Sequence, residues 1–164
     1  MPLPNCIHNL SSLQSSSVVV VSSFPANLTS LEIRNCNFIE ALLEWGLHRL
    51  TSLQHLYIRA NVESFPEKML PASFTTLSIS RFHNLKYMSS LQSLTSLTTL
   101  SIQECENLTS FPEDGLPPSL LTLHVLNCPL LNEHCKKDQG RGWFKIAHIP
   151  YVGIDGKFIY DENQ

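Results

Sequence analysis

Side chains able to bind metal or act as nucleophiles gather near the C-terminal end of this 164-residue sequence. Cys128, His134 and Cys135, with His124 nearby, are of types that bind zinc, and Cys135 beside His134 could pair a thiol with a base. Their spacing matches no common paired-ligand motif, and adjacent residues of an extended chain point to opposite faces. The sequence therefore favours structural roles for these side chains.

Two pairs of carboxylates could support general acid–base hydrolysis. They are Glu104 with Glu106, and Glu113 with Asp114. Both pairs stand in polar segments typical of turns, and no apolar cleft accompanies them in the sequence. We interpret them as solvated surface charges, and we predict that the chain is not an enzyme.

The segment from Gly153 to Lys157, GIDGK, resembles a phosphate-binding loop only superficially. That loop needs four residues between its glycines and Ser or Thr after the Lys, whereas here two residues intervene and Phe158 follows. Asp155-Gly156 between two apolar runs instead predicts a type I′ hairpin, with strands at about 151–154 and 157–160. We therefore predict no nucleotide, no other cofactor and no metal in this chain.

Composition disfavours several further classes of function. With 11 Lys and Arg against 14 Asp and Glu, the net charge is -3, which is unlike a nucleic-acid or anionic-membrane binder. The longest apolar run, Val18 to Val21, is far shorter than the roughly 20 residues of a membrane span. Residues 1–31 lack the charged start of a secretory signal, and the five cysteines are an odd number for a disulfide framework. We expect a cytoplasmic chain with reduced thiols.

The elements that must position these residues come from a segment that recurs five times. Each copy has an apolar residue, two residues, Leu, one residue, Ile or Val, two residues, and most often Cys or Asn. Apolar and polar residues alternate within each copy, which predicts one short, half-buried strand per unit. The middle leucines of the five copies are Leu31, Leu56, Leu77, Leu100 and Leu123.

The residue three positions after each Ile or Val lies where the chain leaves the strand. We predict that the Cys or Asn there turns inward and satisfies backbone groups of the neighbouring unit. These residues are Cys36, Asn61, Cys105 and Cys128, and Phe82 breaks the pattern in the third unit.

The connections between strands alternate between two classes. Ser-Phe-Pro recurs in every second unit, ending at Pro25, Pro66 and Pro112, so long and short returns alternate. The Pro-rich returns must be irregular, because Pro fixes φ and lacks an N–H donor. A helical turn is predicted only for residues 40–50, EALLEWGLHRL.

A unit of about 23 residues cannot bury its own Leu face, so consecutive units must stack. The sequence therefore predicts an α/β solenoid: a curved horseshoe with short parallel strands on its concave face and mostly irregular convex returns. The last coil needs a cover, because it would otherwise expose its core. We predict that Trp143, Phe144, Ile146 and Ile149 form this cap rather than a docking surface.

The repeats resemble leucine-rich repeats. The C-terminal residues are similar to the end of plant intracellular disease-resistance proteins with coiled-coil, nucleotide-binding and leucine-rich-repeat parts, the NBS-LRR proteins. The resemblance covers roughly residues 20–160. It is carried by Cys128 to Leu131, the basic stretch from Lys136 to Arg141, Trp143, and Ile146 to Pro150.

The resemblance implies a role in plant defence and innate immunity. In such receptors the repeats recognise a pathogen effector or its host target and hold a nucleotide switch inactive. ADP or ATP would bind only in that switch domain, which this sequence lacks, so we expect a C-terminal part of such a receptor. We predict a degenerate or truncated repeat at 1–21, five leucine-rich repeats at 22–132, and a C-terminal cap at 133–164 with a hairpin at 151–160.

The outward strand positions vary from copy to copy while the inward Leu and Ile positions stay fixed. A varied face on a fixed scaffold is suited to binding a protein partner, and Tyr and Arg are favoured interface anchors. The candidate partner-binding residues on this face are Glu32, Arg34, His55, Tyr57, Arg59, Gln103 and His124.

We predict a protein partner: an effector, a host target or the receptor's own switch domain. We predict no nucleic acid, membrane or small-molecule substrate. Two alternatives stay open. One is a secreted leucine-rich-repeat inhibitor or receptor fragment, which the sequons at Asn9, Asn27 and Asn107 would suit. The other is a truncated fragment with no partner.

Overall fold

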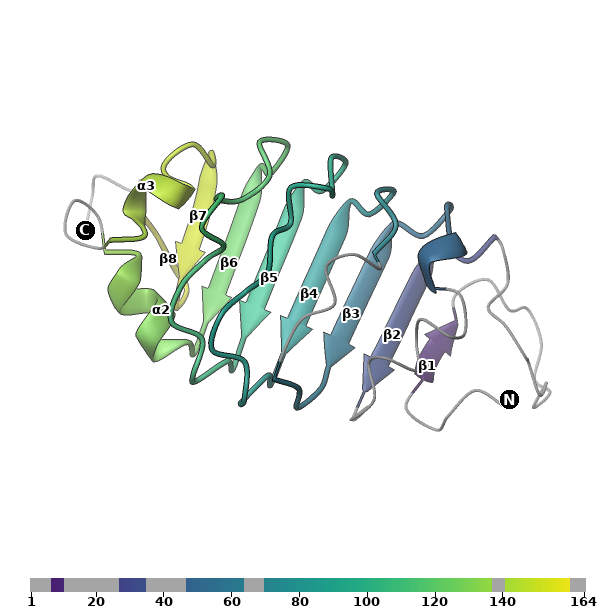
Figure 1. Ribbon diagram of the computed structural model, residues 1–164, viewed down its shortest axis with the longest axis horizontal. Helices are drawn as coiled ribbons and strands as arrows, with labels where there is room; N and C mark the ends of the chain where they lie inside the picture. Colours follow the sequence, from purple (N-terminus) through teal and green to yellow (C-terminus); the bar gives the residue numbers. More distant parts are fainter. Residues whose placement is uncertain (1–6, 11–26, 35–46, 64–69, 137–140, 160–164) are drawn as a thin grey trace.

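The strands of the chain lie side by side in one sheet, in the order in which they occur in the sequence (Figure 1). The computed structural model describes residues 7–10, 27–34, 47–63, 70–136 and 141–159. The described strands are β1 (Ile7–Leu10), β2 (Ser30–Arg34), β3 (His55–Arg59), β4 (Thr76–Ser80), β5 (Thr99–Gln103), β6 (Thr122–Leu126), β7 (Tyr151–Ile154) and β8 (Lys157–Phe158). The described helices are the 3-10 helix η1 (Leu47–Arg49), α2 (Pro129–His134) and α3 (Trp143–Ile146).

Strands β2 to β6 are the five predicted repeat strands, and they pair in parallel without a register shift. Parallel pairing continues into β7, which sets Val152 beside Leu123. The middle leucines therefore form one inward row, in which each side chain is at most 1 % exposed. Burying a Leu side chain contributes roughly 1.5–3 kcal/mol. This stack confirms the predicted leucine-rich-repeat solenoid.

Backbone carbonyls in front of the strands join the units. The carbonyls of Gln54, Thr75 and Thr98 each accept two N–H groups from the start of the next unit, at 2.9–3.0 Å. At the last step the Leu121 carbonyl accepts the N–H of Tyr151 at 3.0 Å. Pro150 takes the position of the first donor and has no N–H, so only one of the two bonds forms at this step.

The returns reflect the two classes predicted from the sequence. In the short class, turns close from Leu50 N–H to the Leu47 carbonyl and from Leu94 N–H to the Leu91 carbonyl, at 3.2 and 3.0 Å. In the long class, a serine hydroxyl donates back to the preceding short unit. Ser73 bonds the Leu53 carbonyl and Ser119 bonds the Leu97 carbonyl, both at 2.8 Å. Of the predicted helical turn at 40–50, residues 40–46 lie outside the described part, and 47–49 form η1.

Left-handed backbone at the strand exits turns the following side chain inward. Arg81, Glu104 and Asn127 have φ of 61°, 53° and 53°. Each is followed by a fully buried residue, respectively Phe82, Cys105 and Cys128. The inward role is thus confirmed for Cys105 and Cys128, whereas Cys36 lies outside the described residues. Phe82 fills the same position with an aromatic ring.

The prediction for Asn61 is wrong, because its side chain is exposed. Ala60 is the buried residue at this exit, and it does not adopt the left-handed backbone of the other units. Without that reversal the alternation of the strand continues by one residue, so Ala60 points inward and Asn61 points to solvent.

The N-terminal strand β1 differs from the repeat strands in direction, because it runs antiparallel to β2 with a register shift between His8 and Leu10. The parallel order therefore starts at β2. The predicted boundary at residue 21 lies outside the described residues.

The C-terminal end is covered by two short helices and a hairpin, seen at the far end of the sheet from β1 (Figure 1). Ile146 and Ile149 are at most 1 % exposed, and Trp143 is partly buried against the same core, as predicted for a cap. Phe144 is 70 % exposed, so its predicted cap role is wrong: neighbouring positions of α3 face different directions. No helix in the described ranges is long and apolar enough to cross a bilayer.

Asp155 ends the sheet at the tip of the hairpin. Its N–H donates to the Val125 carbonyl, and its carboxylate accepts the Asn127 N–H at 2.8 Å and the Asn132 side-chain amide at 2.5 Å. Asp155 and Gly156 have φ of 48° and 79°, the pair of positive angles that a type I′ turn requires. The carboxylate thus takes the place of a carbonyl that a further repeat would supply.

Candidate protein-binding face

The outward side chains of β2 to β7 form the strand face, the surface on which the candidate residues lie. Strand alternation places every second residue here, and the register aligns them in rows across the strands. The row that starts at Arg34 continues through Arg59, Ser80, Gln103 and Leu126. The neighbouring row is Glu32, Tyr57, Ser78, Ser101, His124 and Gly153.

A charged cluster stands at the β2–β3 end of the strand face. Register sets Tyr57 beside Glu32, and Arg59 beside Arg34. The Arg34 guanidinium forms a two-contact ion pair with the Glu32 carboxylate, at 2.5 and 2.6 Å. Arg59 has no such carboxylate partner on β2 or β4, and its Nε atom is buried with no hydrogen-bond acceptor. His55 lies two residues before Tyr57 on the same outward side of β3.

A groove of about 340 Å³ lies at the opposite end, between β5 and the terminal hairpin. We call it the terminal groove. Gly153 is part of its lining, and a Cβ built there would lie 3.2 Å from His124 Nδ1, so the His124 ring lies close over the glycine and a larger residue would displace it. Leu126 and Phe158 reach into it from β6 and β8 and are 42 % and 56 % exposed. The outward side chains that line the groove are Ser101, Gln103, His124, Leu126 and Phe158.

The structure thus divides the predicted site residues between two places. Five belong to the charged end, and two, Gln103 and His124, line the terminal groove. Ser78 and Ser80 of β4 separate the two ends, and Ser80 is only 3 % exposed. Sequence reasoning missed Gly153 and Phe158 as site residues because they come from the cap hairpin. The predicted hairpin could have indicated them, since it pairs Gly153 with Phe158.

The cysteines and histidines considered as zinc ligands, and judged structural from the sequence, are not brought together. Cys128 and Cys135 are fully buried in the core, whereas His124 lies on the opposite face of the same sheet. No group of three or more His, Cys, Asp or Glu among the described residues could hold a metal ion. Cys128 instead contacts Cys105, whose backbone N–H lies 3.4 Å from the Cys128 sulfur.

The buried thiols of Cys105 and Cys135 are poor nucleophiles. A hydrogen bond to the Cys128 side chain and burial raise the pKa of Cys105, and burial together with nearby Cys128 raises the pKa of Cys135 to about 12. The thiolate is the reactive form of cysteine, so both remain protonated and unreactive at neutral pH. Catalysis by Cys135 with His134 has no support in this geometry.

The carboxylate pairs lie at the surface, as interpreted from the sequence. Glu104 forms an ion pair with Arg81 at 2.6 Å, and Asp114 accepts a hydrogen bond from Ser90. Glu106 and Glu113 are exposed. Each of the two bonded carboxylates joins neighbouring repeats, so neither pair forms a reaction centre.

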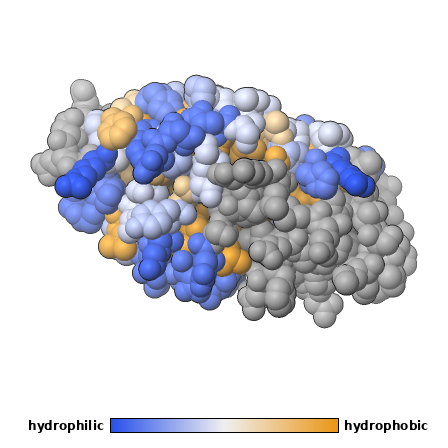
Figure 2. Space-filling model, in the orientation of Figure 1, coloured by the Kyte–Doolittle hydropathy of each residue, from blue (hydrophilic) through white to orange (hydrophobic). Residues whose placement is uncertain are grey.

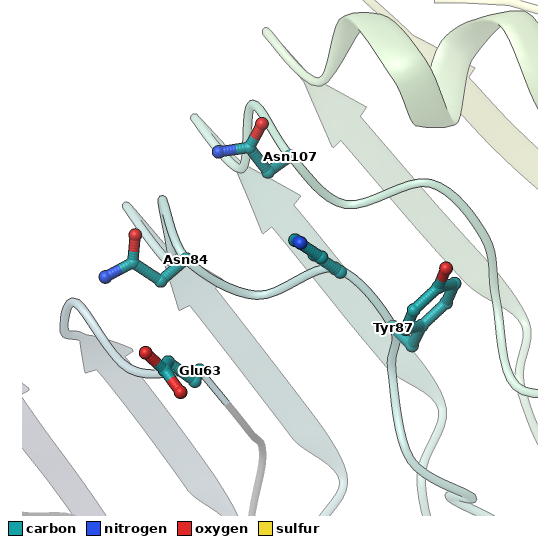
Figure 3. A pocket seen from close by; sticks show the side chains of 5 residues that line it. Glu63, Asn84, Tyr87 and Asn107 are labelled. Atoms are coloured by element: carbon teal, nitrogen blue, oxygen red, sulfur yellow. The ribbon is translucent and has the colours of Figure 1, made fainter.

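A second hollow, of about 530 Å³, lies on the return side of the sheet. Figure 3 shows Glu63, Asn84 and Asn107 at successive turns, with Tyr87 further along one return. The Asn107 amide donates to the His83 carbonyl at 2.6 Å, so it holds the neighbouring turn. Over the described part of the face in Figure 2, hydrophobic residues form small areas among hydrophilic ones.

Comparison with known proteins adds a relative from Arabidopsis thaliana, named "Putative disease resistance protein At3g14460". The two are 37 % identical over 142 residues, which cover 83 % of this chain. The chain is a homologue of this plant disease-resistance protein. The homologous region contains the leucine-rich-repeat solenoid, and it spans 10 % of the relative's length. The resemblance to plant disease-resistance proteins is thereby confirmed. No family model matches the sequence, and no solved structure matches it.

Proposed function

We propose that this chain is a protein-binding module of a plant intracellular immune receptor and that it binds its partner on the strand face. The observation that supports this most directly is the contrast within each repeat strand. Inward positions are Leu, Ile or Val in all five, whereas outward positions range from Arg and Tyr to Ser and Leu. The scaffold does not dictate the outward residues, so they are available for recognition.

The partner is a pathogen effector, a modified host protein or the nucleotide switch of the receptor itself, and the module works in the cytosol. Contact with such a partner would change how the repeats restrain the switch. This chain would contribute recognition only, with no nucleotide, metal or chemical step of its own. Homology to a disease-resistance protein supports this setting.

A co-precipitation experiment tests the proposal. The tagged chain is incubated with plant cytosol beside a face variant that carries Arg34→Ala, Tyr57→Ala and Arg59→Ala. A matched control variant, Arg49→Ala, Lys86→Ala and Tyr87→Ala, changes exposed residues outside the strand face. Circular dichroism and urea unfolding check that all three proteins fold alike.

We expect the chain and the control variant to capture the same switch-domain or host protein, identified by mass spectrometry, and the face variant to lose it at least tenfold. If all three proteins captured the partner equally, the partner would bind outside the strand face. Capture of no switch-domain, effector or defence-related host protein would count against the immune-receptor function.

A further inference from the structure

At the charged end of the strand face, Arg59 has an N–H group without an acceptor. Arg59 Nε is buried without a hydrogen bond, and a guanidinium stays charged at any physiological pH. The one carboxylate among the described outward strand residues is that of Glu32, and it is already paired with Arg34. Two arginines against one glutamate give this face a net charge of +1, although the chain as a whole carries -3. Arg59 as a whole is only partly buried, so a carboxylate from a partner would supply the pairing that the neighbouring residues Arg34 and Ser80 do not.

The terminal groove offers the opposite chemistry. Leu126 is the apolar member of a row whose other residues are Arg or polar, and Phe158 faces it across the groove. Both are substantially exposed, and exposed apolar side chains around a hollow are typical of a site that buries an apolar group. The groove, of about 340 Å³, leaves room for one such side chain.

The distance between these two features is set by the sheet. Arg59 and Leu126 lie in the same row, three strands apart. At about 4.8 Å per strand their backbones are about 14 Å apart, which an extended chain covers in about four residues at roughly 3.4 Å each. Between them β4 contributes only the small side chain of Ser80 to the row. Gln103 is held toward β5 by its amide, which donates to Ser101 Oγ at 3.0 Å.

We propose that the strand face binds an extended segment of a partner protein that runs across β3 to β6, with an Asp or Glu on Arg59 and an apolar side chain about four residues away in the terminal groove. This inference rests on the proposed function, because it specifies the chemistry of the partner at the same face. The pairing of the Arg59 guanidinium with a carboxylate fixes one end of the segment, and burial of an apolar side chain fixes the other.

A peptide selection tests this chemistry without knowledge of the natural partner. A phage-displayed library of random decapeptides is selected on the immobilised full chain, and the enriched peptides are synthesised with a fluorescent label for anisotropy titration. We expect a carboxylate and a large apolar residue three to five positions apart in most enriched peptides. Replacing either residue in the peptide by Ala should weaken binding at least tenfold.

Matched protein variants assign the two contacts. Arg59→Gln and Leu126→Ser should each weaken binding at least tenfold. Arg49→Gln and Leu121→Ser make the same chemical changes at exposed positions away from the row and should leave binding within twofold. Gly153→Ala should also weaken binding, because its Cβ would enter the groove beside His124.

Three results would overturn the inference: no enriched peptide, enriched peptides without the carboxylate and apolar pair, or binding that Arg59→Gln and Leu126→Ser leave unchanged. Dimerisation that Leu126→Ser abolishes, seen by sedimentation velocity, would assign the groove to a second copy instead. The two proposals fail separately. If the face variant loses its plant partner but the selection lacks the pattern, only this inference fails. If the pattern is found but no switch-domain, effector or defence-related host protein is captured, only the immune-receptor function fails.

Discussion

The two faces of strands β2 to β6 share one backbone and one register, yet they are under different constraints. On the inward face the same residue type recurs in each row, because every side chain packs against its neighbours above and below. On the outward face the rows change from charged at β2 and β3, through small and polar at β4, to apolar at β6. The contrast shows that positions constrained by the core and positions that the core leaves free alternate residue by residue along one strand.

The largest effect should come from the inward face. Leu100→Ala removes a fully buried side chain from the middle of the stack and should lower the free energy of unfolding by about 2–5 kcal/mol. Its neighbour Ser101 points outward, and Ser101→Ala should change stability by less than about 0.5 kcal/mol. Urea unfolding followed by circular dichroism measures both. Similar losses in the free energy of unfolding in the two variants would show that inward and outward positions do not differ in their constraints.

A smaller effect is expected where the sheet ends. Asp155→Ala removes the acceptor of the Asn127 N–H and of the Asn132 amide, and should cost about 1–2 kcal/mol in the same urea assay. Asp155→Asn keeps one acceptor oxygen and tolerates the left-handed backbone, so it should lose less. If both variants kept full stability, the carboxylate would have no part in closing the solenoid.

The buried thiols make the stability of the inward side depend on pH. The pKa of Cys135 is raised from 9.0 to about 12, so the unfolded chain releases this proton first as the pH rises. Stability is therefore complete below pH 9 and should fall between pH 9 and 12, by at most about 1.4 kcal/mol per pH unit for this thiol. Urea midpoints at pH 8, 9 and 10 measure the fall, and Cys135→Ala should make it shallower. An equal slope in the variant would exclude Cys135 as its source.

The smallest effect on stability should come from the outward face, with Arg59→Gln. The Arg59 Nε atom makes no hydrogen bond, so losing it should change the free energy of unfolding by less than about 0.5 kcal/mol. Peptide binding should fall at least tenfold in the same protein. A loss of binding without a loss of stability would show that this outward residue, unlike the inward leucines, is not needed for folding. A large loss of stability would instead give Arg59 a structural role.

The repeat strands could be predicted from the sequence because their signal is redundant. Five copies of one pattern place the middle leucines, and alternation then assigns each neighbouring residue to a face. The residues at which the chain leaves each strand are harder to predict. A left-handed φ at Arg81 or Glu104 has no sequence signal comparable to glycine. For the same reason Asn61 looked equivalent to Cys105 although its backbone differs.

The candidate site was predicted only in part, because half of it depends on where the cap folds. Strand alternation brings the Arg and Tyr side chains of β2 and β3 to one face, and this follows from the pattern alone. The terminal groove exists because β8 folds back beside β7 and places Phe158 across from Leu126. The two residues that line this groove are 32 positions apart with no repeat to relate them, so the repeat spacing could not bring them together.

The serine hydroxyls of the long returns determine how many repeats can be gained or lost together without breaking a hydrogen bond. Ser73 and Ser119 each bond a carbonyl of the short unit before them, so a short and a long unit form one interlocked pair. Unequal crossing-over that gains or loses a single unit would set two units of the same class together and leave one of these bonds unmade. Exchange of a whole pair keeps every junction intact. The pair of repeats is thus the natural recombination module, and lineages of this chain should differ in length by pairs while the outward residues diverge within each pair.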